Sequence, residues 1–389
     1  MKRISIIKDY VSVSLIPLYI ISILIPLIIY GRAVNADYQW GTYLVLFIVG
    51  YFILNQKRTY FPSKMIKYTK YFSVLVLLSG ANILLASNLQ HSVIQTIGYS
   101  LVPYMLIIFS YRLCECNTKS EKYLVFYSFI LLILGFYRYF RLESILDIIG
   151  REQASSNAFY YALMPLPCVL LSKNNIIKIS GVSLAAIVCV LSGKRTAIIA
   201  VAFVIFLMIY QNIKTNKKII ILLFLASMVA FHYYGDSLLE RLDYVTVRFQ
   251  GIQDDGGSGR TDLYSNFWKD DINDLFSFPE AFIGEGFRGF NRKHKEFETV
   301  HNDYLEMMYS YGILGFIYMV YLLIYFIKKI KLMKYMPDIR NAYCCFLFLF
   351  IMYSMTGGVF SFIYSSIPLY LFIGLSEHKF KQYETNRLL

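Results

Sequence analysis

The residues best suited to chemistry lie at the end of one long polar stretch, Asp236–Asp303. The stretch closes on His301-Asn302-Asp303-Tyr304-Leu305-Glu306, directly before an apolar run. Histidine is the side chain best suited to take a proton near neutral pH, although a lone histidine is more often structural. A basic cluster that starts at Arg288 precedes it, and cations stabilise a diphosphate leaving group. The combination indicates proton transfer on a diphosphate-bearing substrate.

The composition indicates where these residues work. Of 389 residues, 57% are hydrophobic and 16% are charged, which is typical of polytopic membrane proteins and too apolar for a soluble protein of this size. The net charge of +13 comes from basic residues in short loops between apolar runs, so topology explains it better than nucleic-acid binding. The six cysteines lie in or beside apolar runs and indicate neither a disulfide framework nor a zinc site.

Apolar runs of about 20 residues can cross a bilayer as helices. They predict an all-α membrane protein with about twelve transmembrane helices, nine in residues 1–235 and three in residues 304–389, the latter followed by a cytoplasmic tail. Residues 236–303 form one large external loop between helices 9 and 10. The predicted spans are Val11–Tyr30, Tyr38–Leu54, Tyr71–Ser87, Val93–Tyr111, Tyr123–Phe140, Ala158–Leu171, Ile176–Leu191, Thr196–Tyr210, Ile219–Tyr234, Tyr304–Ile327 and Ala342–Leu375, the last divided at Thr356-Gly357-Gly358.

The loop charges predict the orientation. With twelve spans, the basic loops fall on the same side as Lys2 and Arg3, which the positive-inside rule makes cytoplasmic for both chain ends. The long polar interval then lies outside, and its balance of fourteen Asp and Glu against eight Lys and Arg agrees with that side.

Two further external turns carry cations. One is Ser192-Gly193-Lys194-Arg195-Thr196, and the other holds Arg151 before Asn157. External cations oppose the insertion bias, which favours a role in binding an anion. Snorkelling of the long side chains to lipid headgroups is the alternative.

Other chemistries fit less well. The turn at Lys194 lacks the upstream glycine of a phosphate-binding loop, and it lies on the wrong side of the membrane for ATP. The pairs Asp254-Asp255 and Asp270-Asp271 could bind a divalent cation, but a solvated surface explains both better, so no metal is expected. No Asp or Glu occupies the centre of a span, which argues against an ion-coupled carrier and leaves a lipid flippase open.

The order and spacing of several motifs resemble the O-antigen polymerase and O-antigen ligase superfamily, the Wzy/WaaL-like membrane glycosyltransferases. The matching segments are Gly150-Arg151 through Asn157-Ala158, Leu191 to Ala197, Gly259-Arg260 through Trp268, Phe282 to Phe287, and His301 to Glu306 running into Tyr311 to Gly315. No single motif is specific to the superfamily, and the resemblance depends on their order and common side of the membrane.

The resemblance implies an inverting, metal-independent glycosyltransferase of the GT-C type, without a cofactor. It implies that outward-facing arginines bind the diphosphate and that the signature histidine is the general base for the acceptor hydroxyl. The catalytic candidates are His301, Arg195 and Arg260. The other diphosphate ligands are Arg288, Arg151 and Lys194, and the supporting residues are Asn302, Asp303, Glu306, Asn157 and Trp268.

The function implied is polymerisation of a surface polysaccharide such as O antigen or capsule. Both donor and acceptor are glycans on undecaprenyl diphosphate, at the outer side of a bacterial inner membrane. A ligase that transfers glycan to lipid A core or protein, and a polysaccharide flippase or exporter that forms no bond, are the alternatives. The expected partners are membrane lipids, a chain-length regulator (a polysaccharide co-polymerase) and a flippase.

Overall fold

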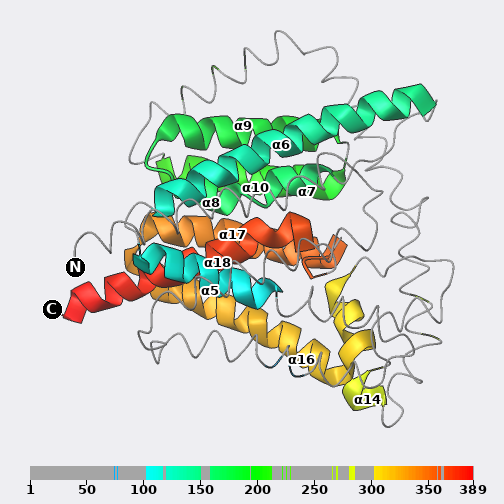
Figure 1. The fold of residues 1–389 in the computed structure, drawn as a ribbon, viewed down its shortest axis with the longest axis vertical. Coiled ribbons are helices and arrows are strands. Elements are labelled where there is room, and N and C mark those ends of the chain that lie inside the picture. Colours follow the sequence, from blue (N-terminus) through cyan, green and yellow to red (C-terminus); the bar gives the residue numbers. More distant parts are fainter. Residues whose placement is uncertain are drawn as a thin grey trace. The chain divides into compact units, whose positions relative to one another are not determined.

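The structure is a computed structural model, and every secondary-structure element in its described part is helical (Figure 1). It describes residues 102–116, 120–149, 158–192, 194–212, 280–284, 302–356, 358–360 and 363–388, with single residues Val74, Leu77, Ile221, Leu225, Met228, Ser265 and Lys269. The helices divide between two compact units. The first unit holds α5, α14, α16 and α18, and the second holds most of α6, α7 to α10 and most of α17.

Two helices in the described part are long and apolar enough to cross a membrane. They cover Asp303–Tyr335, which comprises α16 (Asp303–Leu332) with the short helix η3 (Met333–Tyr335), and Pro337–Thr356, which is α17. Shorter apolar helices cover Asn175–Leu191 and Arg195–Tyr210. These helices fit the all-α membrane class, while the predicted spans Val11–Tyr30, Tyr38–Leu54, Tyr71–Ser87 and Ile219–Tyr234 lie outside the described residues except for a few single positions.

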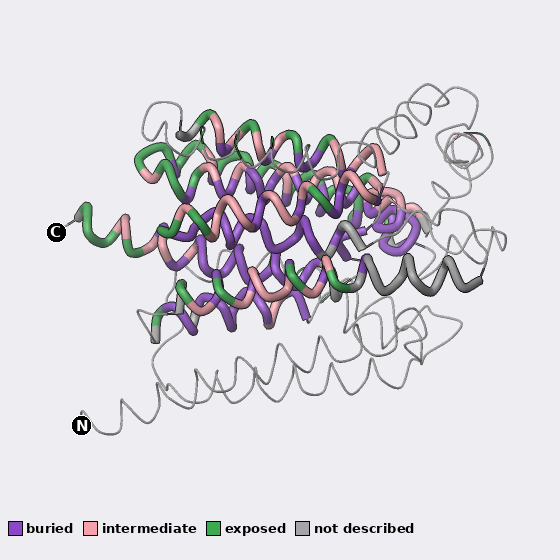
Figure 2. The backbone as a smooth tube through the Cα atoms, turned by 90° about the horizontal axis from the view of Figure 1, so that it is seen from above, coloured by how far each residue is buried: buried purple, intermediate pink, exposed green. Residues whose placement is uncertain are grey.

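In the first unit, α5 (Val102–Cys116) packs along α18 (Ile363–Leu388). The Ser110 hydroxyl donates a hydrogen bond of 2.5 Å to the Leu371 carbonyl oxygen, so the two backbones lie close together. A Cβ atom added at Gly374 would lie 2.8 Å from the Tyr111 backbone nitrogen, which explains the glycine at this crossing. Figure 2 shows the buried positions of the described helices in purple and the exposed last turns of α18 in green.

A polar cluster joins α16 to the far half of α18. The Lys329 ammonium lies 2.9 Å from one carboxylate oxygen of Glu377 and 3.0 Å from the other, and 4.2 Å from the centroid of the Phe380 ring. Lys379 pairs with Glu121 at 2.6 Å. This ion pair of low exposure links α16 to α18.

The second unit is built around a helical hairpin, α9 (Asn175–Leu191) and α10 (Arg195–Asn212). The short helices α7 (Ala158–Leu163) and α8 (Leu166–Leu170) pack against α9, and residues 162–172 are buried throughout. On α10, the ring of Phe203 stacks on Phe348 of α17, with 4.0 Å between the ring centroids. The long helix α6 (Ser120–Ile149) completes this unit.

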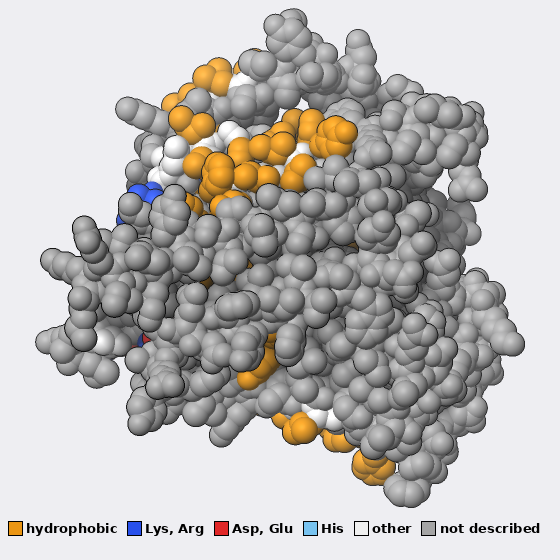
Figure 3. Space-filling view, in the orientation of Figure 1, with side chains coloured by type: hydrophobic (Ala, Val, Ile, Leu, Met, Phe, Trp, Pro, Cys, Tyr) orange, Lys and Arg blue, Asp and Glu red, His pale blue; other side chains and the backbone are white. Residues whose placement is uncertain are grey.

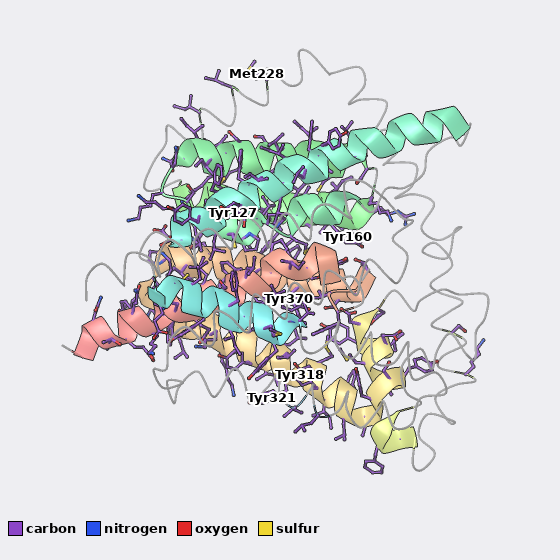
Figure 4. All side chains as sticks on the ribbon, viewed as in Figure 1. Tyr127, Tyr160, Met228, Tyr318, Tyr321 and Tyr370 are labelled. Carbon is purple, nitrogen blue, oxygen red and sulfur yellow. The ribbon has the colours of Figure 1, made fainter. Side chains whose placement is uncertain are left out.

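The outer faces of the described helices are apolar as well as their inner faces. On α16, Tyr318 is buried whereas Tyr321 is 41% exposed (both labelled in Figure 4), and the exposed face also carries Ile317, Ile324 and Ile327. In Figure 3 hydrophobic side chains gather over α6 and α9, where Phe126, Ile133, Tyr137, Ile176 and Ile187 are exposed. A helix that is hydrophobic all round is typical of a membrane span or of the core of a large protein.

Several helix boundaries differ from those expected from the sequence. Helix α6 continues to Ile149, so Arg141 is helical and does not lie in an external loop. The expected span Ala158–Leu171 is interrupted at Met164 and Pro165, because a proline ring cannot continue the preceding hydrogen-bond pattern. The division of Ala342–Leu375 is confirmed, since α17 ends at Thr356 and α18 begins at Ile363.

Candidate functional site

The start of α16 is fixed by the signature residues that follow His301 in sequence. Asn302 caps the helix, because its side-chain oxygen accepts hydrogen bonds from the backbone N–H groups of Tyr304 at 3.0 Å and Leu305 at 3.3 Å. Its carbonyl oxygen accepts the first helical bond, from the Glu306 N–H at 2.9 Å. The supporting role expected of Asn302 is therefore that of a helix cap.

The two carboxylates of the signature lie in the first turn of α16 and are both buried. One Asp303 oxygen accepts backbone N–H groups from Val359 at 2.5 Å and Phe360 at 3.4 Å. The Ser310 hydroxyl donates to Glu306 at 3.4 Å, one helical turn further on. Carboxylates at a helix N-terminus are favoured by the helix dipole, so both positions suit acidic residues.

Helix α16 is broken at Gly312, which has φ +63° and ψ −155°. This backbone conformation is accessible essentially only to glycine. The break separates a first segment, Asp303–Tyr311, from the longer apolar segment that ends at Leu332. The signature residues therefore stand on a short helix whose direction differs from that of the main span.

The motif Phe282-Ile283-Gly284 packs onto this break. Phe282 and Ile283 are the last residues of α14 (Glu280–Ile283), and Gly284 follows it. Helix α14 lies beside the bend of α16 in Figure 1. A Cβ atom on Gly284 (φ +75°) would lie 2.5 Å from the backbone nitrogen of Tyr311, and one on Gly312 would lie 2.6 Å from the Ala281 carbonyl oxygen. Two motifs that are 28 positions apart in sequence, from Gly284 to Gly312, thus meet through their backbones.

We expect Gly312→Ala to destabilise the protein, by about 1–3 kcal/mol from the backbone conformation alone. The new methyl group also meets the Ala281 carbonyl, which adds to the loss. Thermal unfolding of the purified protein in detergent should show a lower midpoint for Gly312→Ala and for Gly284→Ala.

The control for this measurement is Gly181→Ala, in the middle of α9, where the added methyl would meet a side-chain atom of Val169 and no backbone. We expect a smaller loss there, because alanine also favours the helix by about 1 kcal/mol over glycine. A Gly312→Ala protein as stable as wild type would show that the break is not required.

The second group of candidates lies in the turn between α9 and α10. The Ser192 hydroxyl donates to the Cys189 carbonyl at 2.8 Å and accepts the Lys194 N–H at 3.4 Å, so it links the two helices. From α6, the Tyr139 hydroxyl donates to the Leu191 carbonyl at 2.9 Å. Hydrogen bonds from two sides hold the turn in one conformation.

Arg195 is the first residue of α10, and Lys194 precedes it. The Lys194 carbonyl accepts the N–H groups of Ala197 and Ile198 at 3.0 and 3.1 Å, so α10 starts here, and both cationic side chains are half-buried. The start of a helix carries partial positive charge and attracts anions. Two cations at this end are repelled by the positive end of the helix dipole, and a bound anion would offset that repulsion.

The other predicted site residues lie outside the described part of the structure: Arg151, Asn157, Arg260, Trp268, Arg288 and His301. Lys194 and Arg195 belong to the second unit, whereas Asn302, Asp303 and Glu306 belong to the first. A single cavity that contains Arg195 and His301 therefore stays a prediction. Within the described helices, no group of three or more His, Cys, Asp or Glu side chains could hold a metal ion.

The comparison with protein families agrees with these two groups of residues. The family profile described as O-Antigen ligase matches residues 180–320. The matched region starts in α9, contains the turn with Arg195, and extends through the break of α16. Residues 180–320 are therefore similar to the O-antigen polymerase and ligase superfamily.

This match confirms the resemblance to the superfamily that was seen in the sequence. Members are glycosyltransferase-like membrane enzymes of O-antigen biosynthesis, which agrees with the apolar helices of this chain. No curated protein matched the chain in a direct sequence comparison.

Sequence reasoning missed the residues that form hydrogen bonds with Asp303 of the signature. Val359 and Phe360 contact Asp303 from a position 56 and 57 residues further along the chain, beyond the region that the family profile matches. The glycine pair after Thr356 indicated a break there, but it gave no sign of a partner. Gly284 and Gly312 were noted as parts of separate motifs and not as a contact.

Proposed function

We propose that this protein is a surface-polysaccharide polymerase at the outer side of a bacterial inner membrane. It transfers the growing glycan from undecaprenyl diphosphate to the non-reducing end of a new lipid-linked repeat unit. The reaction needs no nucleotide, because the donor already carries a good leaving group.

The observation that carries the proposal is the family match over residues 180–320. That region contains the cationic turn at Arg195 and the signature at His301, to which the resemblance assigns diphosphate binding and proton transfer from the acceptor hydroxyl. The Asn302 cap and the buried carboxylates at the start of α16 support it, since a catalytic side chain needs a rigid attachment.

In the proposed reaction, the acceptor hydroxyl oxygen attacks the anomeric carbon of the donor from the face opposite the diphosphate. A glycosidic C–O bond forms while the C–O bond to the diphosphate breaks, so the configuration inverts. His301 accepts the hydroxyl proton, and undecaprenyl diphosphate leaves with the bonding electron pair. A positioned base of this kind contributes about 10²–10⁴-fold to the rate.

The arginines stabilise the leaving group. Arg195 and Arg260 bind the diphosphate oxygens, with Arg288, Arg151 and Lys194 as further ligands. Guanidinium groups suit this role, because their planar array of donors forms paired, charge-assisted hydrogen bonds with phosphate oxygens. Their effect is largest in a site of low dielectric, where developing charge on the diphosphate is poorly screened by water.

The second candidate function is ligation of the glycan to lipid A core or to protein. The description of the matching family as O-Antigen ligase favours it. The donor, the leaving group and the proposed roles of Arg195 and His301 are the same in both reactions, and only the acceptor differs.

Purified protein in liposomes, given a synthetic undecaprenyl-diphosphate oligosaccharide as both donor and acceptor, should form a ladder of longer glycans. No ATP or added metal should be required. Chelator and apyrase in the same assay provide the controls for contaminating metal and nucleotide.

Three results would redirect the proposal. Product on added lipid A core without a ladder would identify a ligase. Movement of the lipid-linked glycan across the liposome membrane with no new bond would identify a carrier. A ladder that disappears on treatment with chelator or apyrase would contradict the metal-independent, nucleotide-independent mechanism.

A further inference from the structure

The described residues of the turn between α17 and α18, Gly358–Phe360, are buried and form hydrogen bonds with α16 and α18. Gly358, Val359 and Phe360 are all buried, and the Gly358 N–H donates to the Tyr353 carbonyl at 2.9 Å. Gly358 has φ +143°, a conformation that side chains disfavour. The polar backbone groups of the turn therefore need partners inside the protein.

Asp303 supplies the partner on one side. A single carboxylate oxygen accepts the N–H groups of Val359 and Phe360, and the residue is only 1% exposed. On the other side, the Tyr370 hydroxyl of α18 donates to the Val359 carbonyl at 3.3 Å. The turn is thus bound to the first residue of α16 through Val359 and Phe360, and to α18 through Val359.

The hydrogen bonds between Asp303 and the turn restrict the position of the first residues of α16. Asp303 follows the Asn302 cap and is two positions after His301. The helix start cannot shift or rotate without breaking the hydrogen bonds to the turn, since their acceptor is the first helical side chain. Charge-assisted hydrogen bonds to a buried carboxylate are among the stronger ones in proteins, so this attachment is rigid.

We infer that Asp303 is a positioning residue, which uses the α17–α18 turn to fix the start of α16 and with it the placement of His301. The inference rests on the proposed role of His301 as the base. The segment Gly358–Phe360 would then contribute to the proposed glycosyl-transfer site, although it lies beyond the region matched by the family profile. Misplacement of a reacting group by about 1 Å can cost about 10²-fold in rate.

The test is a double-mutant cycle between Asp303 and His301, measured as kcat and KM for the lipid-linked oligosaccharide in the liposome assay. We expect Asp303→Ala to lower kcat by about 10–10²-fold with little change in KM. In the His301→Ala background the same change should have almost no further effect, within about twofold, because there is no base left to position.

Two further variants separate positioning from folding. Asp303→Asn keeps a side-chain acceptor oxygen of the same shape, so it carries the test if Asp303→Ala does not fold, and we expect a smaller loss of kcat. Tyr370→Phe removes the hydrogen bond to Val359 from the other side and leaves Asp303 in place. It should lower thermal stability while kcat stays within about twofold of wild type.

The outcomes distinguish this inference from the proposed function. Equal losses from Asp303→Ala in the wild-type and His301→Ala backgrounds would overturn it, as would wild-type kcat for correctly folded Asp303→Ala and Asp303→Asn. A kcat loss in Tyr370→Phe equal to that in Asp303→Asn would also overturn it, because the effect would then follow from loosening of the turn. Full activity of His301→Ala would instead reject the base assigned in the proposed function.

Discussion

Replacing His301 with alanine is expected to lower the turnover of lipid-linked glycan by about 10²–10⁴-fold. The reason is chemical, because a sugar hydroxyl is a weak nucleophile until a base takes its proton as the new bond forms. The loss should appear in kcat and leave KM for the donor nearly unchanged, since the diphosphate ligands remain. Single-turnover assays with a labelled donor would measure both quantities.

The control for this variant is His91→Ala. His91 lies in another short loop on the predicted external side, between the predicted spans Tyr71–Ser87 and Val93–Tyr111. It lies apart from every motif of the superfamily resemblance, so we expect turnover within about twofold of wild type, as for most surface substitutions. A His301→Ala protein with wild-type kcat would exclude histidine as the base.

Replacing Arg195 with alanine should give the next largest effect. Hydrogen bonds to charged groups contribute about 1.5–3 kcal/mol, which predicts a loss of about 10–10²-fold in kcat/KM. Arg195 is the first residue of α10, in a turn held by Ser192 and Tyr139, so its removal should leave the fold unchanged. Arg195→Lys should recover part of the loss, since it keeps the charge but not the paired donors.

Lys178→Ala provides the matched control for Arg195→Ala. It removes a half-buried cation at the opposite end of the same hairpin, in the first turn of α9. Kinetics of both variants should be measured at two salt concentrations, because only a diphosphate ligand should weaken donor affinity in a salt-dependent way. Equal losses in the two variants would show that general surface charge, and not Arg195 in particular, matters.

Helices with local sequence signals were predicted well. The limits of α9 and α10 agree within two residues with the apolar runs Ile176–Leu191 and Thr196–Tyr210, and the break after Thr356 coincides with two glycines. Hydrophobicity is a property of consecutive residues, so a single sequence reveals it. The end of α6 was predicted less well, because polar residues after Phe140 continue the helix where a loop was expected.

The candidate site was predicted by residue type more than by arrangement. Asn302, Asp303 and Glu306 were predicted as supporting residues, and the structure places them at the start of α16, while their part in catalysis stays a prediction. The sequence could not show which groups form hydrogen bonds with each of these three residues. A cap such as Asn302 contacts groups two and three residues away, whereas the partner of Asp303 comes from a different helix junction.

The sequence by itself determined the apolar runs of an all-α class, the resemblance to the O-antigen polymerase and ligase superfamily, the cation at Arg195 and the histidine signature at position 301. Only the tertiary structure decided that α16 breaks at Gly312 against Gly284, and that Asp303 holds the turn at Val359. Motif and hydrophobicity are encoded in neighbouring residues. Contacts between residues 28 and 56 positions apart depend on how the helices pack, which no local pattern specifies.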